Sequence, residues 1–211
     1  MNRCVQKRLV RRIINGDNAA CAQLVRTYQD VIYGFLLHLS RDRRAAEELT
    51  CDTFAAAWMN LAGFRGFADV STWLHRIAYR RFLDWQRQAR RMIELKGRAS
   101  AVTVNGEVPN PLDELLVSEE MQRLSWAIAG LDPPGREVIV LHYFQGLSFR
   151  RMADVLGEPS GTVKWRTSAA LARLKVMLNE KREEESSANE KQRLPIAGES
   201  PAKISTSDGA C

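Results

Sequence analysis

The sequence predicts an all-α protein built from two small helical domains joined by a flexible linker. Apolar residues recur at helical spacing through most of the chain, whereas the patterns typical of strands are weak. Residues 94–111 hold two glycines and two prolines and no sustained amphipathic face, which is typical of a linker. With 211 residues, of which 45% are hydrophobic, the chain is long and apolar enough for two folded domains.

The first domain is predicted over residues 1–93, with three long helices. Two of them lie in the segments NAACAQLVRTYQDVIYGFLLHL and RRAAEELTCDTFAAAWMNLAGF, and each carries an apolar stripe at helical spacing. In the second segment we expect Phe54, Ala57, Trp58 and Leu61 to form that stripe. A short aromatic loop with Gly63 and Gly66 follows, and Ser71 or Thr72 is expected to be the N-cap of the third helix, TWLHRIAYRRFLDWQRQARR.

The second domain is predicted over residues 112–178. A helix is expected to begin at Pro133 and Pro134, because proline in the first turn forfeits no helical hydrogen bond. Gly146 should end that helix, Ser148 should cap the next, and Gly157 should end the latter. Residues 179–211 are charged, contain no aromatic residue, and are predicted to form a disordered tail.

Positive charge is concentrated in two places. The formal net charge of the chain is +6. Residues 65–98 contain nine basic and three acidic residues, and residues 148–178 contain six basic and two acidic residues. Two separate basic segments suit a polyanion that is bound at two places, with salt-dependent affinity.

Several functional classes are disfavoured by what the sequence lacks. It has no apolar run long enough to span a bilayer, and its N-terminal residues have no secretory-signal pattern, so we expect a cytoplasmic protein. The four cysteines and three histidines are scattered, which predicts free thiols and no metal site. We find no carboxylate cluster, phosphate-binding glycine loop or nucleophile–base pair, so we predict neither a cofactor nor an enzymatic activity.

The segment LSFRRMADVLGEPSGTVKWRTSAALARLK predicts a helix-turn-helix. Its first helix offers an apolar packing face, Gly157 permits a tight turn, and small polar residues open a basic second helix with Leu171 turned inward. Residues at the start of this second helix are the candidates for binding duplex DNA: Ser160, Gly161, Thr162, Lys164, Trp165 and Arg166. We expect Lys164 and Arg166 to point outward. By itself this motif fits both a sigma factor and an autonomous LuxR-like transcriptional regulator.

The first domain favours the sigma factor. Its motifs are Ala46-Glu47-Glu48-Leu49, Thr53-Phe54, Trp58, Phe64-Arg65-Gly66, and Thr72-Trp73-Leu74 with Arg76-Ile77-Ala78. Together with the helix-turn-helix, this order resembles RNA polymerase sigma factors of the sigma-70 family, extracytoplasmic-function (ECF) subfamily. A LuxR-type regulator would instead carry an α/β domain here. The resemblance implies a dissociable subunit that directs core RNA polymerase to promoters and initiates transcription.

That resemblance also implies partners and a division of labour. The first domain would bind the clamp helices of the polymerase β′ subunit and capture the melted minus-ten element of promoter DNA. The second would read the minus-thirty-five element as duplex, and an anti-sigma factor would mask both domains.

Candidate residues for the minus-ten element lie on the third helix and the loop before it. At about 100° per residue, Arg76, Arg80 and Arg87 fall within one arc, opposite Leu74 and Ala78. The full candidate set is Arg65, Phe67, Ser71, Thr72, Trp73, Arg76, Arg80 and Arg87. Capture of an extruded base needs stacking and backbone charge pairing, which aromatic and arginine side chains provide. Trp73 fits equally a core residue and a wedge in DNA.

Candidate residues for polymerase binding lie on the helix before the aromatic loop: Glu47, Glu48, Leu49, Asp52, Thr53 and Trp58. An acidic surface beside apolar residues suits a protein partner better than DNA. Three places depart from the family pattern, and one of them is Tyr79-Arg80, which replaces a frequent Arg-Asn pair. Cys51 stands where the family usually has glutamine, and Ser168-Ala169-Ala170 replaces a frequent Arg-Ala-Arg run. We therefore expect contacts with the upstream element to depend more heavily on Lys164 and Arg166.

Overall fold

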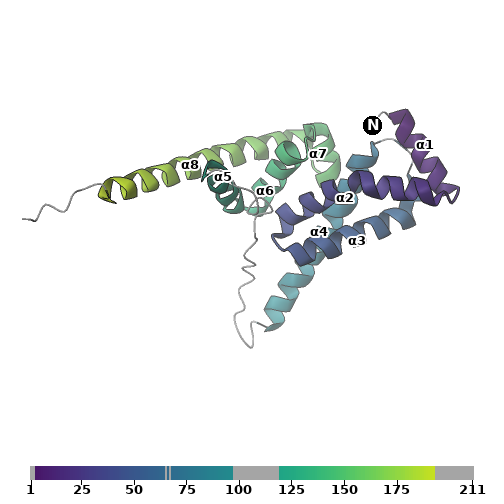
Figure 1. The fold of residues 1–211 in the computed structure, drawn as a ribbon, viewed down its shortest axis with the longest axis horizontal. Coiled ribbons are helices and arrows are strands. Elements are labelled where there is room, and N and C mark those ends of the chain that lie inside the picture. The colour runs from purple at the N-terminus through teal and green to yellow at the C-terminus, as the bar shows by residue number, and fades with distance from the viewer. Residues whose placement is uncertain (1–2, 65, 67, 97–118, 193–211) are drawn as a thin grey trace, which may run out of the picture.

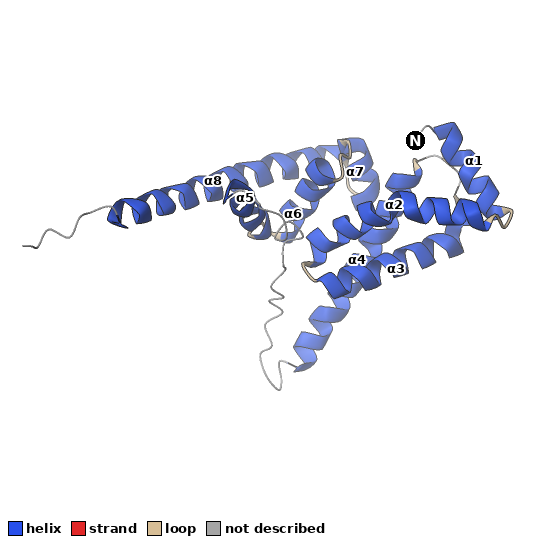
Figure 2. Cartoon of the chain, viewed as in Figure 1, coloured by secondary structure: helices blue, strands red, loops and turns tan. Residues whose placement is uncertain are grey.

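The structure is a computed structural model that describes residues 3–64, 66, 68–96 and 119–192. Every regular element in these ranges is helical (Figures 1 and 2). The elements are α1 (Arg3–Ile14), α2 (Asn18–Ser40), α3 (Arg43–Asn60), η1 (Leu61–Gly63), α4 (Val70–Lys96), α5 (Glu119–Ala129), α6 (Pro133–Ile139), η2 (Val140–Phe144), α7 (Phe149–Leu156) and α8 (Ser160–Gln192). The prediction of an all-α protein is confirmed for this part of the chain.

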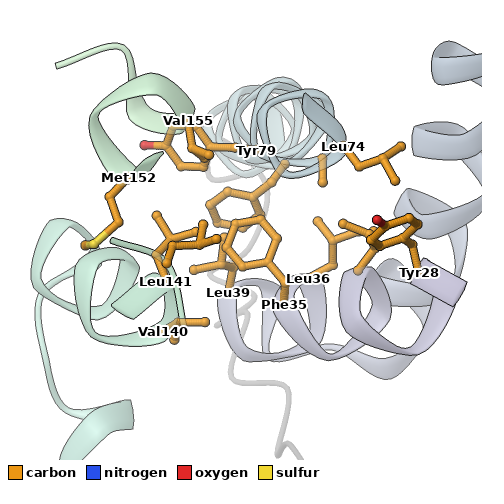
Figure 3. Close-up of a cluster of buried hydrophobic side chains, with 14 of the residues drawn as sticks. Tyr28, Phe35, Leu36, Leu39, Leu74, Tyr79, Val140, Leu141, Met152 and Val155 are labelled. Atoms are coloured by element: carbon orange, nitrogen blue, oxygen red, sulfur yellow. The ribbon is translucent and has the colours of Figure 1, made fainter. Parts of the chain in front are cut away.

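Helices α1 to α4 form the first bundle. Aspartate N-caps start two of these helices: Asp17 accepts a hydrogen bond from the Ala20 amide, and Asp42 accepts one from the Ala45 amide, both at 3.0 Å. The core contains fully buried Ile32, Phe35 and Leu36 of α2, and the last two lie toward α4 (Figure 3). Burying such large apolar side chains holds the bundle together, at about 1.5–3 kcal/mol each.

Helices α5 to α8 form the second bundle. As predicted, α6 begins at Pro133, and Gly157 ends α7 in the left-handed region with φ 73°. The chain between α6 and α7 makes a π-helical turn, η2, whose Val140 and Leu141 are fully buried. Met152 of α7 and Val163 of α8 complete this core, so the turn positions α7 and α8 as a helix-turn-helix.

The two bundles pack directly against each other. Helix α7 lies along α4, and η2 lies against α2, so Val140, Leu141 and Met152 extend the core of the first bundle (Figure 3). The Tyr79 hydroxyl of α4 donates to Glu137 Oε2 of α6 at 3.0 Å. Arg151 of α7 forms an ion pair with buried Asp69, next to the start of α4. The interface is thus both apolar and polar.

Three boundaries differ from the sequence-based expectations. Helix α1 was not predicted, because the basic residues within it obscure the small apolar set Leu9, Val10 and Ile13. Helix α4 begins at Val70, where Trp73 N donates to Asp69 O at 3.0 Å, so Ser71 and Thr72 lie inside the first turn and neither is the N-cap.

The third difference is at the C-terminus, where a disordered tail was predicted from residue 179. Helix α8 continues to Gln192 instead. Glutamate, lysine and arginine in this stretch are strong helix formers. The Lys181 ammonium also lies 4.3 Å from the centre of the Trp126 ring of α5, which attaches this part of α8 to the second bundle. The predicted linker lies largely outside the described residues, as do residues 112–118 and 193–211.

Candidate nucleic-acid interface

Helix α4 presents two adjacent stripes with different partners. His75 and Tyr79 are buried beneath the second bundle, whereas Arg76 and Arg80, each one residue further on, are exposed. Arg87 continues the exposed stripe and forms an ion pair with Asp84. The predicted arc of arginines is therefore brought together on one accessible side of the helix.

A cavity of about 420 Å³ lies between α3, η1 and α4, beside the exposed arginines. An aromatic ring, an amide, two guanidinium groups and one carboxylate, which is paired with Arg87, surround it. The lining residues are Ala56, Asn60, Gly63, Trp73, Ile77, Arg80, Arg81 and Asp84. This combination offers stacking, hydrogen bonding and positive charge within one space. A planar polar group attached to a phosphate matches all three properties.

Trp73 is half-buried, so it is neither a closed core residue nor a free wedge. Its ring packs against Phe64 at 5.1 Å between centroids with a tilt of 57°. One side of the indole thereby holds the loop to α4, and Trp73 also lines the cavity. Packing fixes the orientation of a ring that remains accessible, and a contact of that ring with DNA stays a prediction.

The remaining candidates for the minus-ten element either are less accessible to DNA in this arrangement or lie outside the described residues. Arg65 and Phe67 belong to the second group. Thr72 is 2% exposed, and its hydroxyl has no hydrogen-bond partner in the described part of the chain. Ser71 is half-buried, and its carbonyl accepts a hydrogen bond from His75 Nδ1 at 2.8 Å. The first turn of α4 directs the Thr72 side chain inward in this arrangement, and its contact with DNA stays a prediction.

Helix α3 exposes an acidic surface next to a tryptophan. Glu47, Glu48 and Asp52 are exposed, and Trp58 is 49% exposed. The prediction that Trp58 belongs to the buried stripe is therefore wrong, although exposure suits the partner contact proposed for it. Leu49 and Thr53 are buried, and the Thr53 hydroxyl donates to Leu49 O at 2.7 Å, so these two side chains position the helix and do not face a partner.

The start of α8 is open to solvent on one side. Ser160, Gly161, Thr162 and Lys164 are exposed, and Trp165 is 71% exposed. Ser168 and Ala169 on the following turn are also exposed. Leu171, which was expected to face inward, is 40% exposed, because Val163, Thr167, Ala170 and Leu174 occupy the inner side. The outward side therefore presents one cation, one large aromatic ring and several small polar groups.

Arg166 was predicted to point outward, but its side chain is turned into the protein. Its side chain is only 12% exposed and contacts three acceptors: Glu158 at 2.6 Å, the Pro134 carbonyl at 2.6 Å and Glu137 at 3.0 Å. Burial acts to lower the pKa of Arg166, but the hydrogen bonds to Glu158 and Glu137 outweigh it and raise the pKa. The arginine is thus committed to holding α6, α7 and α8 together in this arrangement.

Glu137 and Tyr79 belong to a buried polar cluster that the sequence analysis did not identify. Glu137 is the one acidic residue in the apolar run REVIVL, and a carboxylate at such a position signals a buried partner. Burial raises its pKa, against the opposing effect of hydrogen bonds from Tyr79 and Arg166. Burial, followed by the charge of Glu137, raises the pKa of Tyr79. The cluster links the two bundles through one carboxylate.

His75 makes a second polar link between the bundles. Its ring is fully buried, packs 5.1 Å from the Phe35 ring, and places Nε2 3.3 Å from Gln145 Oε1. Burial lowers the pKa of His75, whereas hydrogen bonds to Ser71 and Gln145 act in the opposite direction. Burial therefore favours the neutral form of the imidazole.

No metal site or membrane span is found in the described ranges. Among these residues, no group of three or more His, Cys, Asp or Glu side chains is placed to hold a metal ion. No helix there has the length and apolar character needed to cross a bilayer. Cys4 and Cys51 are exposed free thiols, and Cys21 is a half-buried one.

Comparison with protein families matches both bundles. The model of sigma-70 region 2 matches residues 24–92, and the model of sigma-70 region 4 matches residues 121–174. The first match covers the α3 surface, the cavity and the exposed arginines of α4. The second covers most of the second bundle, including the open side of α8.

Individual relatives agree with the family matches. The chain is 28% identical over 171 residues to the ECF RNA polymerase sigma factor SigK of Mycolicibacterium vanbaalenii, covering 81% of this chain and 87% of the relative. It is 29% identical over 167 residues to the RNA polymerase sigma factor YlaC of Bacillus subtilis, covering 77% of this chain and 94% of that protein.

Two solved structures share the arrangement of most of the chain. One is the sigma factor RpoE in complex with the anti-sigma factor NepR from Bartonella quintana, with a TM-score of 0.63 and 25% identity over 75% of this chain and 96% of that one. The other is CnrH in complex with the cytosolic domain of CnrY, with a TM-score of 0.62 and 25% identity over 83% of this chain and 97% of that one.

Proposed function

The chain belongs to the extracytoplasmic-function group of the sigma-70 family, and from that premise we propose how its two domains divide promoter recognition. As a sigma factor it directs core RNA polymerase to promoters as a dissociable subunit. In our proposal α3 docks on polymerase, α4 captures and opens the minus-ten element, and α8 reads the minus-thirty-five element. One observation carries the proposal: the cavity beside Trp73 and Arg80 lies within the region-2 match.

At the minus-ten element, a base extruded from the duplex would enter the cavity and stack on Trp73. Arg80 would then pair with the adjoining phosphate, and Arg76 and Arg87 would follow the backbone. Extrusion of a base costs a few kcal/mol, which stacking at about 1–3 kcal/mol per base and charge pairing offset. This promoter opening would need binding energy alone, so we propose no catalytic step for the chain itself.

Polymerase binding is assigned to the exposed side of α3. Glu47, Glu48 and Asp52 supply acidic groups, and Trp58 supplies a large accessible ring. Tryptophan is enriched among residues that dominate protein interfaces. The family resemblance implies that the clamp helices of the β′ subunit are the partner, which would place the protein in the cytoplasm.

Duplex reading is assigned to the open side of α8. Ser160, Gly161 and Thr162 would bind phosphate at the start of the helix. Lys164 and Trp165 would face the major groove, where the Lys164 ammonium would also contact a phosphate. Arg166 is left out of this direct set, because Glu137 and Glu158 occupy its guanidinium. Its role is to hold the reading helix in position.

We also propose that the two bundles separate when the protein works. Elements named for positions ten and thirty-five lie roughly 25 base pairs apart, or about 85 Å of duplex at 3.4 Å per base pair. Two bundles in direct contact do not span that distance. Because the similar sigma factors RpoE and CnrH were solved with anti-sigma partners, we propose that an anti-sigma factor stabilises the closed arrangement of this chain as well.

Transcription by reconstituted polymerase tests the proposed function. The purified chain should associate with core polymerase and support run-off transcription, and unpaired thymines near position minus ten should react with permanganate. Trp73→Ala should reduce open complexes roughly 5- to 100-fold, because stacking on the extruded base is lost. The matched control is Trp126→Ala, which removes a 50% exposed tryptophan from the second bundle and should leave opening unchanged.

Two outcomes would contradict the proposal. The chain might fail to associate with core polymerase, or it might recognise promoter duplex equally well without polymerase, as an autonomous regulator does. Circular dichroism and polymerase binding of Trp73→Ala establish that the variant is folded, so that a change in opening reports on DNA.

A further inference from the structure

Helix α1 (Arg3–Ile14) carries a strongly basic side that lies outside the region-2 match, which begins at residue 24. Its twelve residues include five basic and no acidic ones. Gln6, Leu9, Val10 and Ile13 form its buried side. At about 100° per residue, Lys7, Arg8, Arg11 and Arg12 span an arc of about 140° centred opposite that buried side.

The basic side is attached to the loop that leads into α4. Gln6 Oε1 accepts a hydrogen bond from the Val70 amide at 3.2 Å, which ties α1 to the first residue of α4. The Lys7 stem lies over Gly66: a Cβ placed there would be 2.9 Å from Lys7 Cε. The same loop begins at Phe64, whose ring packs on Trp73 at the cavity. Lys7 therefore lies at the loop beside the cavity, and Arg8 and Arg11 continue from it along the same side of α1.

Most of these cations are not neutralised within the protein. Arg12 pairs with Asp17 at 2.7 Å. Lys7, Arg8 and Arg11 are exposed, and none has an acidic ion-pair partner in the described ranges. Lys7 with Arg11 and Arg8 with Arg12 are like-charged pairs at i,i+4 spacing, which destabilise a helix by about 0.2–0.5 kcal/mol each. A bound polyanion would remove this repulsion.

A membrane surface is a poor candidate for the partner. Basic amphipathic helices bind bilayers by inserting their apolar side among the lipids. In α1 that side is already buried in the bundle, with Leu9, Val10 and Ile13 each 3–4% exposed. The exposed apolar residues of α1, Val5 and Ile14, are each 50% exposed and lie at opposite edges of the basic side, so they form no continuous apolar side for insertion. The basic side itself adjoins the loop of the cavity.

We propose that Lys7, Arg8 and Arg11 of α1 bind the phosphate backbone of the single-stranded DNA that passes from the minus-ten cavity across the Gly66 loop. The contact is independent of base sequence and extends the length of unpaired strand that the protein binds. It rests on the proposed function, since it continues the path of the captured strand. Lys7 and Arg11 are about 6 Å apart along the helix axis, so both can contact one strand.

The salt dependence of single-strand binding tests this contact. The probe is a fluorescent oligonucleotide that carries the nontemplate minus-ten segment and its flanks, from a promoter that the holoenzyme transcribes. The triple variant Lys7→Gln, Arg8→Gln, Arg11→Gln should bind it roughly 10- to 100-fold more weakly at about 0.1 M salt. The slope of log affinity against log salt should fall by about 2, since each lost phosphate contact contributes about 0.7.

The control removes the same charge elsewhere on the first bundle. Arg26→Gln, Arg43→Gln, Arg44→Gln changes three exposed arginines of α2 and α3 and should leave affinity and slope unchanged. An unchanged slope in the α1 variant, an equal loss in both triple variants, or lost affinity of the α1 variant for core polymerase would each overturn the α1 contact. Failure of the wild-type holoenzyme to bind the probe would instead refute the proposed capture of the minus-ten strand.

Discussion

Helices α4 and α8 carry the two basic segments of the chain, but they use their arginines in opposite ways. On α4, Arg76 and Arg80 are exposed beside a cavity, while the packing side of the helix carries apolar residues with His75 and Tyr79 and no arginine. On α8, Arg166 is turned into the protein between Glu137 and Glu158, and Lys164 with Trp165 faces outward. The difference teaches that the basic residues of one segment divide between exposed groups, which are available to a ligand, and buried groups, which hold the domain together.

The largest expected effect is on the free energy of unfolding, which should differ between arginine substitutions in α4 and in α8. Arg166→Ala leaves the carboxylates of Glu137 and Glu158 without their countercharge, and breaking such a buried pair costs about 3–5 kcal/mol. Arg76→Ala, on the exposed stripe of α4, should change the free energy of unfolding by no more than about 0.5 kcal/mol. Urea denaturation followed by circular dichroism measures both. Equal effects of the two substitutions would contradict the division between the helices.

A smaller effect is expected on DNA binding by α8. Lys164→Gln should weaken binding of the holoenzyme to promoter duplex and reduce the slope of log affinity against log salt by about 0.9, because one phosphate contact is lost. Arg173→Gln is the matched control, since nine residues at about 100° each place it on the opposite side of α8. If Lys164→Gln left the binding unchanged, the outward side of α8 would not be the reading side.

The smallest effect concerns the dependence of stability on pH. Burial lowers the pKa of His75 in the folded protein below its value in the unfolded chain. The unfolded state therefore binds more protons between these two pKa values, so the stability that His75 contributes is present above about pH 6.5 and is lost as the pH falls through the folded pKa.

His75→Gln removes this titration and should flatten the fall in stability between about pH 7 and pH 5. Glu137 acts in the opposite direction, because burial raises its pKa, but it is present in both proteins and cancels in their difference. Thermal denaturation at several pH values measures the difference between wild type and variant. A difference that does not vary with pH would show that His75 does not titrate in this range.

Much of the candidate site follows from local sequence. Pro133 at the start of α6, Gly157 in the left-handed turn after α7 and the arc of arginines on α4 were all predictable, because each depends on backbone preference or helical period. The two sigma domains were recognisable from motifs on both sides of the linker. Helix α1 was missed because only three of its apolar residues form the buried side, and five cations surround them in the sequence.

The sequence by itself determined that this protein is helical, has two sigma domains and carries two basic segments. Only the tertiary structure decided which charges are accessible. Arg166 is 29 residues from Glu137, and Tyr79 is 58 residues from it, so nothing in the local sequence specifies their contacts. Helical period fixes the sides of a helix relative to one another, but packing against other helices decides which side meets solvent, and therefore which residues can meet DNA.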